Sequence, residues 1–388
     1  MKAVTLQASW EPRSDVKMAD QAIADKLAPM ACNAWRHPRL ELRDVPELTP
    51  GPRDVVIDIS VCGICGSDTH CIETDTDGYV VFSGPASFPC TLGHEFAGTV
   101  LETGREVSRV RKGELVTAEG MLYCGDCAAC QKGHVNQCLH LRMVGFSHPG
   151  AFAERTVVHE KHCWSIDGIA ERTGSGTQAA AIASLVEPVG CAQNGMFVVG
   201  PGVSSDAHVV VFGCGPIGLG AIALARAANA ASITAFDLTE GRVALARKMG
   251  ADVAYNSTNM STADVGTAIR EHTGGWGADM VVEAAGAALK TMPIIEAVVA
   301  PGGTVVYLGR TGERVGVMLD VLVSQAARIV GARGHAGYGI FPHIIQMLEA
   351  GALDLSPMIT HSAPLDDFAE AFARSQRRED GKIILVQP

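Results

Sequence analysis

Long basic runs are missing from this sequence of 388 residues, which contains no block of five consecutive lysines or arginines. With 31 basic and 42 acidic residues, its formal net charge at pH 7 is −11. A chain of this charge repels polyanions, and no basic block reverses the effect locally. We therefore expect no nucleic-acid partner.

An uninterrupted apolar stretch is also missing. The opening MKAVTLQASW has no apolar segment after its lysine, so we expect no secretory signal peptide. The longest uncharged run, residues 207–225, has the length of a membrane span but carries four glycines and Pro216. These residues suit a strand, a turn and a helix better than a spanning helix. We expect a cytoplasmic protein with no membrane segment.

The two halves of the chain follow different patterns. In the first half, short branched runs such as 54–61 and 98–101 lie between Gly/Pro turns, as β-strands do. From about Asn194, strands alternate with helices, which predicts a parallel, doubly wound sheet. An insertion over roughly 11–39 has apolar residues at helical spacing and predicts a short surface helix without chemistry. We predict an α/β fold with domains 1–193 and 194–333 and a return to the first domain over 334–388.

The second half contains a dinucleotide-binding pattern, G-x-G-x-x-G, between a predicted strand (208–212) and a predicted helix (217–230). Its glycines let the backbone approach a pyrophosphate, whose charge the helix N-terminus then meets. Asp237 ends the next strand, where its carboxylate can bind ribose hydroxyls and repel a 2′-phosphate; Arg242 offsets part of that repulsion. This predicts NAD rather than NADP, with a glycine turn that binds no ligand as the alternative. The predicted cofactor-binding residues are Gly213, Gly215, Pro216, Ile217, Gly218, Asp237, Arg242, Leu308 and Gly309.

Four of the twelve cysteines lie close together in the pattern C-x2-C-x2-C-x7-C. Four neighbouring thiolates repel one another unless a soft cation holds them, and tetrahedral zinc is the commonest solution. An iron–sulfur run shares the first spacings, but its fourth cysteine would follow x3 and precede proline, not Leu139. Unliganded thiols are the other alternative. A closed four-thiolate shell predicts a structural zinc bound by Cys124, Cys127, Cys130 and Cys138.

A second, dispersed set of metal ligands comprises Cys65 in GICGSDTH, the pair His94 and Glu95, and Glu187 in VEP. One thiolate, one imidazole and one carboxylate balance the charge of Zn²⁺ and leave a fourth position open for substrate oxygen, as a catalytic zinc requires. Taken singly, His94 fits a core histidine and Glu95 a surface acid, so spacing alone leaves a shared metal open.

In their order along the chain, GICGSDTH, LGHE, the four-cysteine run, VEP and VFGCGPIGLG resemble the zinc-dependent medium-chain dehydrogenase/reductase family, sorbitol and polyol branch. The stretches MKAVTLQASWEPR, GYVVFSGPASFPCTLGHEFAG and GHAGYGIFPHIIQML are similar to the scyllo-inosose 3-dehydrogenases and related cyclitol dehydrogenases. The resemblance implies a β-rich GroES-like catalytic domain with a zinc lobe at about 120–142. A Rossmann domain that binds NAD interrupts it, with the active site in a cleft between the two.

The resemblance also assigns roles to residues. Ser67 would contact the substrate hydroxyl and, with His70, pass its proton to solvent. Asp68 would accept a hydrogen bond from the imidazole of His94. Glu187 stands where alcohol dehydrogenases proper have a cysteine, and would bind the catalytic zinc directly or through water. The remaining ligands of that zinc would be Cys65, His94 and Glu95.

The function implied is a zinc-dependent oxidoreductase that transfers a hydride between NAD and a secondary alcohol of a cyclic polyol, with two zinc ions per chain. A carboxylate-rich metal site and the net charge of −11 favour a neutral inositol, inosose or aminocyclitol. The alternatives are a cyclitol epimerase that retains NAD, a linear polyol dehydrogenase, and an NAD-binding regulator on the same scaffold. A homodimer or homotetramer is expected. Pocket candidates, for which ordinary packing is the alternative, are Tyr79, Phe82, Arg310 and His335.

Overall fold

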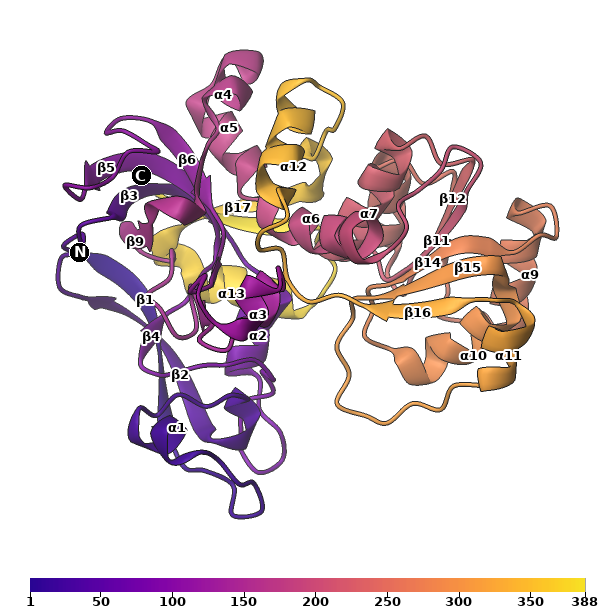
Figure 1. Ribbon diagram of the computed structural model, residues 1–388, viewed down its shortest axis with the longest axis horizontal. Coiled ribbons are helices and arrows are strands. Elements are labelled where there is room, and N and C mark those ends of the chain that lie inside the picture. The colour runs from indigo at the N-terminus through magenta and orange to yellow at the C-terminus, as the bar shows by residue number, and fades with distance from the viewer. Residues whose placement is uncertain (388) are drawn as a thin grey trace. The chain divides into compact units, whose positions relative to one another are not determined.

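The computed structural model describes residues 1–387, which form two compact units (Figure 1). The first unit comprises Met1–Glu187, His361–Arg378 and 383–387, and the second comprises Pro188–Thr360 and Glu379–Lys382. The second unit thus begins before the predicted residue 194 and continues beyond the predicted 333. The reason is packing around Gly190, where an added Cβ would lie 2.9 Å from the Cβ of His335 and 3.8 Å from Phe341.

Antiparallel strands dominate the first unit. Its largest sheet has the order β10-β6-β5-β3-β18-β17, and β9 also pairs with β3. The predicted strands 54–61 and 98–101 are confirmed as parts of β3 and β5, and the predicted strand 382–386 as β18. Smaller sheets are β2-β1-β4 and β7-β8. The strand bounds are β1 Lys2–Trp10, β2 Trp35–Asp44, β3 Asp54–Gly63, β4 Cys90–Thr91, β5 Glu95–Thr103, β6 Leu115–Ala118, β7 Met121–Leu122, β8 Arg142–Met143, β9 Arg155–His159, β10 Cys163–Ser165, β17 Ile359–Pro364 and β18 Lys382–Val386.

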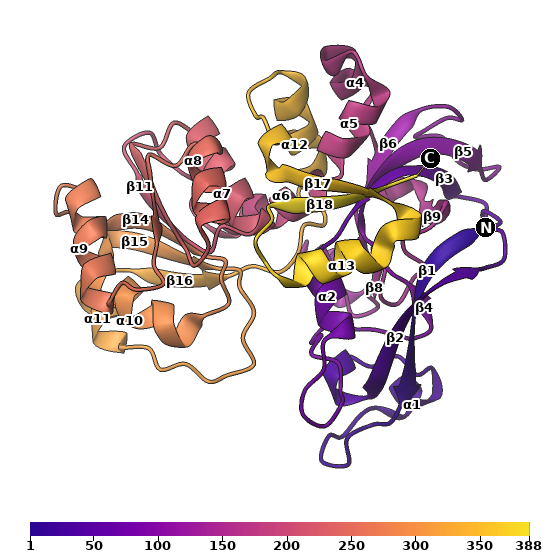
Figure 2. The ribbon, with the colours of Figure 1, turned by 180° about the vertical axis from the view of Figure 1, so that it is seen from behind.

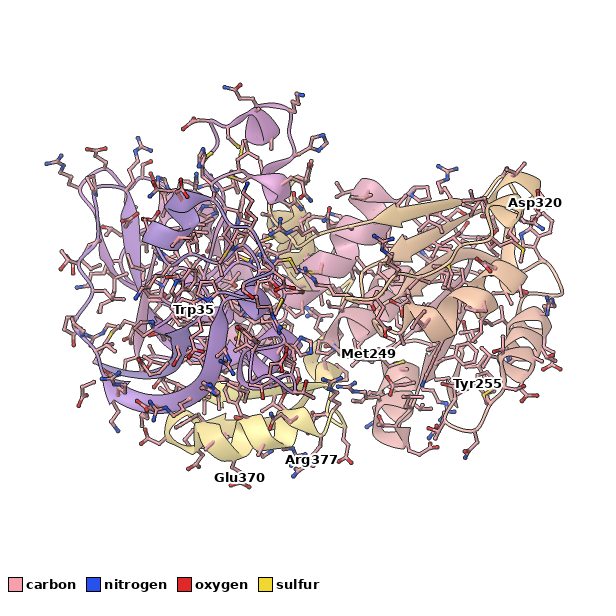
Figure 3. The ribbon with its side chains drawn as sticks, turned by 90° about the horizontal axis from the view of Figure 1, so that it is seen from below. Trp35, Met249, Tyr255, Asp320, Glu370 and Arg377 are labelled. Carbon is pink, nitrogen blue, oxygen red and sulfur yellow. The ribbon has the colours of Figure 1, made fainter. Side chains whose placement is uncertain are left out.

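The core of the first unit is built around Trp35 and the buried faces of β1, β3 and β5. The Trp35 ring lies 4.9 Å from that of Trp10 and 5.3 Å from that of Phe88, centroid to centroid. It lies inside the unit, whereas Glu370 and Arg377 lie on its surface (Figure 3). Helix α13 packs beside α2 (Figure 2). The helix bounds are α1 Asp20–Ala24, α2 Gly66–Ile72, α3 Ala128–Gln131, α4 Asp167–Thr173, α5 Gly176–Ala183 and α13 Phe368–Gln376.

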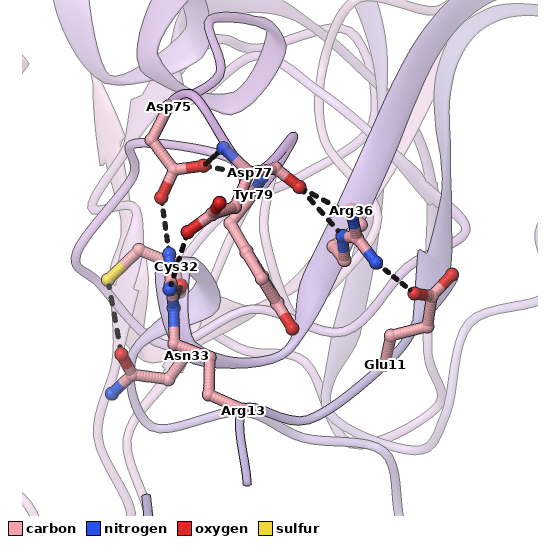
Figure 4. Close-up of polar contacts among 8 residues, drawn as sticks. All are labelled: Glu11, Arg13, Cys32, Asn33, Arg36, Asp75, Asp77 and Tyr79. Atoms are coloured by element: carbon pink, nitrogen blue, oxygen red, sulfur yellow. Dashed lines mark hydrogen bonds and ion pairs between the residues drawn. The ribbon is translucent and has the colours of Figure 1, made fainter. Parts of the chain in front are cut away.

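The predicted insertion forms the short helix α1 and a 3-10 turn over Ala31–Asn33, and it is held by polar contacts. Tyr79 lies between two guanidinium groups: the Cζ atoms of Arg13 and Arg36 lie 3.9 Å and 5.0 Å from its ring centroid (Figure 4). Arg13 also pairs with Asp75, and Arg36 donates to the carbonyl of Asp77 at 2.5 Å and 3.0 Å. These contacts fasten the loop that follows α2 to the insertion.

Removing the ring of Tyr79 should therefore weaken the first unit. We expect Tyr79→Ala to lower the free energy of unfolding by about 1–2 kcal/mol, since each cation–π contact contributes about 0.5–1 kcal/mol. Tyr79→Phe keeps both contacts and should stay within about 0.5 kcal/mol of wild type. Urea unfolding followed by tryptophan fluorescence measures both variants, and equal losses for the two would contradict a role for the ring.

A six-stranded parallel sheet forms the second unit, in the order β13-β12-β11-β14-β15-β16. Helices α7 and α8 cover one face and α9 and α10 the other (Figures 1 and 2). The strand bounds are β11 His208–Phe212, β12 Ser232–Asp237, β13 Val253–Asn256, β14 Ala278–Glu283, β15 Val299–Tyr307 and β16 Arg328–Gly331. The helix bounds are α7 Pro216–Ala227, α8 Glu240–Lys248, α9 Thr262–His272, α10 Ala288–Val298, α11 Leu319–Ser324 and α12 Ile340–Glu349.

The run 207–225 is confirmed as a strand, a turn and a helix: Gly213 and Gly215 lie between β11 and α7, and Gly218 and Gly220 lie within α7. A different stretch, Gly176–Val199, comprises α5, α6 (Val186–Gln193) and a π-helix (Asn194–Val199). By length and composition it could cross a membrane, but 78% of its most apolar window is buried in the protein, as in a core helix.

Candidate functional site

The four cysteines of the first unit meet around one point. Their Sγ atoms all lie within 4.8 Å of one another, and three of the pairs are 3.5 Å, 3.9 Å and 4.0 Å apart. A tetrahedral zinc with Zn–S bonds of about 2.3 Å places its sulfurs about 3.8 Å apart. In an iron–sulfur cluster the thiolates bind different irons, which spreads them further. The geometry of Cys124, Cys127, Cys130 and Cys138 therefore fits a single zinc ion.

Backbone amides prepare this lobe for a cation. The Sγ atom of Cys127 accepts a hydrogen bond from Leu139 N at 3.4 Å, and Cys138 Sγ accepts from His140 N at 3.3 Å. Hydrogen bonds from the backbone lower the pKa of Cys127 to about 6, whereas burial raises the pKa of Cys130 to about 12. Zinc binds cysteine as the thiolate, so metal binding by such a site is coupled to proton release.

Three candidate ligands of the dispersed set also meet in the first unit. Ligand atoms of Cys65, His94 and Glu95 all lie within 4.8 Å of one another. Cys65 is the N-cap of α2, and Glu95 begins β5 with His94 directly before it, so a helix start and a strand start converge. His94 is 5% exposed and Glu95 is fully buried. A soft sulfur, an imidazole and a carboxylate suit zinc and leave room for a further ligand.

Asp68 supports two of these ligands at once. One of its carboxylate oxygens accepts from Cys65 N at 2.9 Å, and the other lies 3.5 Å from Nδ1 of His94. Burial lowers the pKa of His94, but the charge and hydrogen bonding of Asp68 and Cys65 together raise that pKa well above its ordinary value. A carboxylate at Nδ1 leaves Nε2 for a metal, which is the arrangement predicted from the resemblance.

Ser67 and His70 lie one turn apart on α2, beside the three ligands. Ser67 Oγ is 3.3 Å from Nε2 of His94, and the side chain of His70 is 44% exposed. The Nε2 atom of His70 lies 4.0 Å from the carboxylate of Glu73, which in turn lies 3.5 Å from Arg378. The hydroxyl thus faces the metal ligands while the imidazole faces solvent.

Two aromatic side chains pack next to the metal ligand His94. The Phe146 ring lies 4.9 Å from that of His94 and stacks on Phe82 at 4.4 Å. The candidate Phe82 therefore lies near the site through Phe146, whereas the candidate Tyr79 lies in the guanidinium contacts described above. Sequence reasoning missed Phe146, because no motif surrounds it and its burial depends on distant strands.

The predicted ligand Glu187 stands apart from the other three. It lies in the first turn of α6 and is 8% exposed. Within residues 1–387, its carboxylate does not join the ligand atoms of Cys65, His94 and Glu95 that lie within 4.8 Å of one another. Its direct coordination of the metal stays a prediction. Two other pocket candidates lie in the second unit: Arg310 is exposed, and buried His335 has Nδ1 4.0 Å from Sγ of Cys191.

In the second unit, the G-x-G-x-x-G segment forms a tight turn between β11 and α7. Gly213 has a φ of +89°, and a Cβ on Gly218 would collide with the carbonyl of Gly213. A Cβ on Gly215 would have Arg242 Nη1, 3.9 Å away, as its nearest neighbour, so space beside that residue is open. Pro216 is the first residue of α7, and Ile217 and Gly218 follow it in the first turn of the helix. The turn fits a dinucleotide phosphate.

Asp237 ends β12 as predicted, and its carboxylate is held by backbone donors. It accepts from Cys214 N at 2.7 Å, from Leu238 N at 2.7 Å and from Thr239 N at 3.0 Å. Arg242 is held on α8 by a hydrogen bond from Nε to the carbonyl of Asp380 at 3.0 Å. The carboxylate of Asp237 is thus fixed against the glycine turn, and the guanidinium of Arg242 lies near Gly215. This arrangement matches the adenosine end of a nicotinamide cofactor site.

Comparison with known families follows the same division of the chain. The family profile described as "Alcohol dehydrogenase GroES-like domain" matches residues 51–168, and the profile described as "Zinc-binding dehydrogenase" matches residues 216–350. The chain belongs to the zinc-dependent medium-chain dehydrogenase/reductase family. This dehydrogenase therefore combines a GroES-like domain with a Rossmann-type domain, acts on a small-molecule alcohol, and uses zinc and a nicotinamide cofactor.

Similar proteins cover almost the whole dehydrogenase. It is 36% identical to "Scyllo-inosose 3-dehydrogenase" of Thermotoga maritima in an alignment of 387 positions that covers 97% of each chain. It is 34% identical to "L-threonine 3-dehydrogenase" of Saccharopolyspora erythraea, over 90% of this chain and 96% of that one.

Solved structures agree with these relatives. An alcohol dehydrogenase structure from Thermotoga maritima superimposes with a TM-score of 0.94, 34% identity and 99% coverage of both chains. A zinc-binding dehydrogenase from Sinorhizobium meliloti 1021, solved bound to NADP, gives a TM-score of 0.77 at 25% identity, covering 98% of this chain and 99% of that one.

Proposed function

We propose that this dehydrogenase transfers a hydride between NAD and a secondary alcohol of a cyclic polyol such as an inositol, an inosose or an aminocyclitol. The observation that carries the proposal is the convergence of Cys65, His94 and Glu95 beside the hydroxyl of Ser67. It combines a zinc site with a hydroxyl able to relay a proton from an alcohol. The identity to scyllo-inosose 3-dehydrogenase over nearly the whole chain supports the cyclitol class.

The proposed chemistry divides among the residues of the chain. When bound, zinc supplies a Lewis acid for the substrate oxygen, and the nicotinamide accepts the hydride. Cys65, His94 and Glu95 would hold the ion, and Glu187 would complete its shell directly or through water. Ser67 Oγ takes the proton of the substrate hydroxyl and passes its own toward His70, whose exposed imidazole releases it to water.

Replacing His70 should slow this proton transfer without disturbing the metal. We expect His70→Gln to lower kcat about 10²-fold and to change the pH dependence of turnover, because general acid–base groups contribute about 10²–10⁴-fold. Both zinc ions should remain, as measured by elemental analysis. His343→Gln, an exposed histidine of α12, is the matched control and should behave as wild type. Loss of metal from His70→Gln would contradict the assigned role.

The preference for NAD rests on Asp237, whose carboxylate would repel a 2′-phosphate, against the opposing charge of Arg242. We expect kcat/KM to be higher for NAD than for NADP in steady-state assays. Equal kcat/KM values for the two cofactors would contradict the preference for NAD. A higher kcat/KM for NADP would indicate that Arg242 binds the 2′-phosphate.

The substrate class is tested by a panel of inositols, inososes, aminocyclitols, linear polyols, L-threonine and primary alcohols, assayed for NADH formation or consumption. Cyclitols should give the highest kcat/KM. Turnover confined to primary alcohols would overturn the proposal, and a preference for L-threonine or sorbitol would replace the substrate class. Purified enzyme that retains NAD and interconverts cyclitols without net NADH would indicate an epimerase.

We also propose that the protein is a cytoplasmic homodimer or homotetramer. Light scattering at working concentration tests the assembly, and a mass near the 40.6 kDa of one chain would contradict it.

A further inference from the structure

Glu283 is a fully buried acid that the proposed chemistry does not use. It is the last residue of β14, and in the sheet it pairs with Phe212, the last residue of β11. The strand order reverses direction between β11 and β14. In open parallel sheets, ligands bind outside the carboxyl ends of the strands at this reversal point. Glu283 therefore lies beneath the place where a dinucleotide crosses from one half of the sheet to the other.

Glu283 holds two loops at this edge. Its carboxylate accepts from Gly286 N at 3.2 Å, from Ala287 N at 3.2 Å and from Thr291 Oγ1 at 3.5 Å, all in the segment that follows β14. Its main-chain carbonyl accepts from Leu308 N at 2.9 Å and Gly309 N at 2.8 Å, in the segment that follows β15. One residue thus ties together the loops after the first two strands of the second half of the sheet.

These loops pack directly on the glycine turn that follows β11. A Cβ added to Gly213 would lie 2.7 Å from Ala285 N, and one added to Gly309 would lie 2.5 Å from Glu283 Oε2. The glycine turn packs directly on Ala285, and Gly309 packs against Gly286 and the Glu283 carboxylate, so little space remains to absorb a shift. Displacement of the 284–287 loop would therefore narrow or open the space beside the glycine turn.

The carboxylate is costly to bury, so its place needs a reason beyond packing. Burial raises the pKa of Glu283, and the amides of Ala287 and Gly286 lower it in part. Backbone donors have replaced the water around this group. These hydrogen bonds stabilise one conformation of the 284–287 loop, and the part of the loop that does not contact Glu283 can contact a ligand.

We propose that Glu283 is a positioning residue for the nicotinamide half of the cofactor. The first half of such a sheet, β11 to β13, binds the adenosine half of a dinucleotide, and the second half, beginning with β14, binds the other mononucleotide. Glu283 organises the loops of the second half alone. Its removal should weaken binding of the whole dinucleotide but not of its adenosine half. This inference rests on the dinucleotide site of the proposed function.

The test compares dissociation constants for NADH and for AMP, measured with wild type, Glu283→Ala, Glu283→Gln and the control Glu271→Gln. NADH binding is followed by its fluorescence and AMP binding by calorimetry. Glu283→Ala should weaken NADH about tenfold, the equivalent of one or two hydrogen bonds, and change AMP binding less than about twofold. Glu283→Gln keeps one acceptor oxygen and should lie between Glu283→Ala and wild type. The exposed Glu271 of α9 should have no effect.

Each outcome decides a different point. Equal weakening of NADH and AMP by the Glu283 variants would show general loosening of the unit and overturn the inference. Unchanged NADH binding would also overturn it. If Glu283→Ala is insoluble, Glu283→Gln alone supports the inference by raising the Kd for NADH and the KM for the cofactor while the alcohol KM stays constant. A wild-type chain that binds neither NADH nor NADPH would instead refute the proposed function.

Discussion

Replacing Cys65 with alanine should remove one of the two metal ions and lower dehydrogenase activity by about 10³-fold or more. A Lewis acid at the substrate oxygen contributes several kcal/mol, and each 1.36 kcal/mol corresponds to about a factor of ten in rate. The four-cysteine lobe shares no ligand with this site, so its ion should stay. The zinc content measured by elemental analysis should fall from about two ions per chain to about one, because we expect one closed and one open zinc site in the protein.

The position of Cys65 at the start of α2 calls for a second variant. Its sulfur and the carboxylate of Asp68 form a capping box, so alanine removes a helix cap as well as a metal ligand. Cys65→Ser retains a good capping oxygen but loses the thiolate. Both variants should lack the catalytic metal, and only Cys65→Ala should lose about 1 kcal/mol of stability through the cap. Cys32→Ser, outside both metal sites, should resemble wild type. Full activity in either Cys65 variant would refute the catalytic site.

Replacing Cys127 with serine should have the largest effect on stability. Structural zinc in small thiolate sites contributes about 10–16 kcal/mol to folding of its local unit, as much as the whole stability of a typical domain. We expect loss of one zinc ion, protease sensitivity within 120–142, and a fall in Tm of at least about 10 °C.

The contrast between the two cysteine variants separates the two metal sites. Limited proteolysis followed by mass spectrometry locates the loosened segment in Cys127→Ser, and Cys32→Ser again serves as control. A Cys127→Ser protein with two zinc ions and an unchanged Tm would show that the four sulfurs hold no metal. Chelation of wild type should remove activity first and stability later, since the catalytic site has an open position.

The parts of the fold that could be predicted from sequence are those encoded by short continuous patterns. The strand 208–212 and its glycine turn were predicted correctly, because a buried parallel strand is a run of branched residues ended by glycine. The four-cysteine lobe was predicted for a similar reason, since its ligands lie within fifteen residues. Pro301, Gly302 and Gly303 are residues typical of a turn, but the structure includes them within β15, where the register against β14 shifts.

What could not be predicted depends on contacts between distant segments. Phe146 approaches His94 only after the sheets of the first unit have formed, and its surrounding sequence carries no motif. Glu283 could be read as the end of a strand, but not as the residue that holds two loops. The predicted return of the chain at 334 differs from the structure, in which helix α12 packs around Gly190 within the second unit. Helices α9 and α10 were not predicted.

The strand β18 has a consequence for synthesis. It pairs with β3, yet more than three hundred residues separate the two in the chain. During translation, all of residues 188–360 leave the ribosome before β18 does, so the parallel sheet of the second unit can assemble first. The segment that carries Cys65 follows β3, and the place of β18 beside β3 in the sheet stays empty until β18 has been synthesised. Nascent chains truncated before 383 should therefore contain a folded second unit and an incompletely folded first unit.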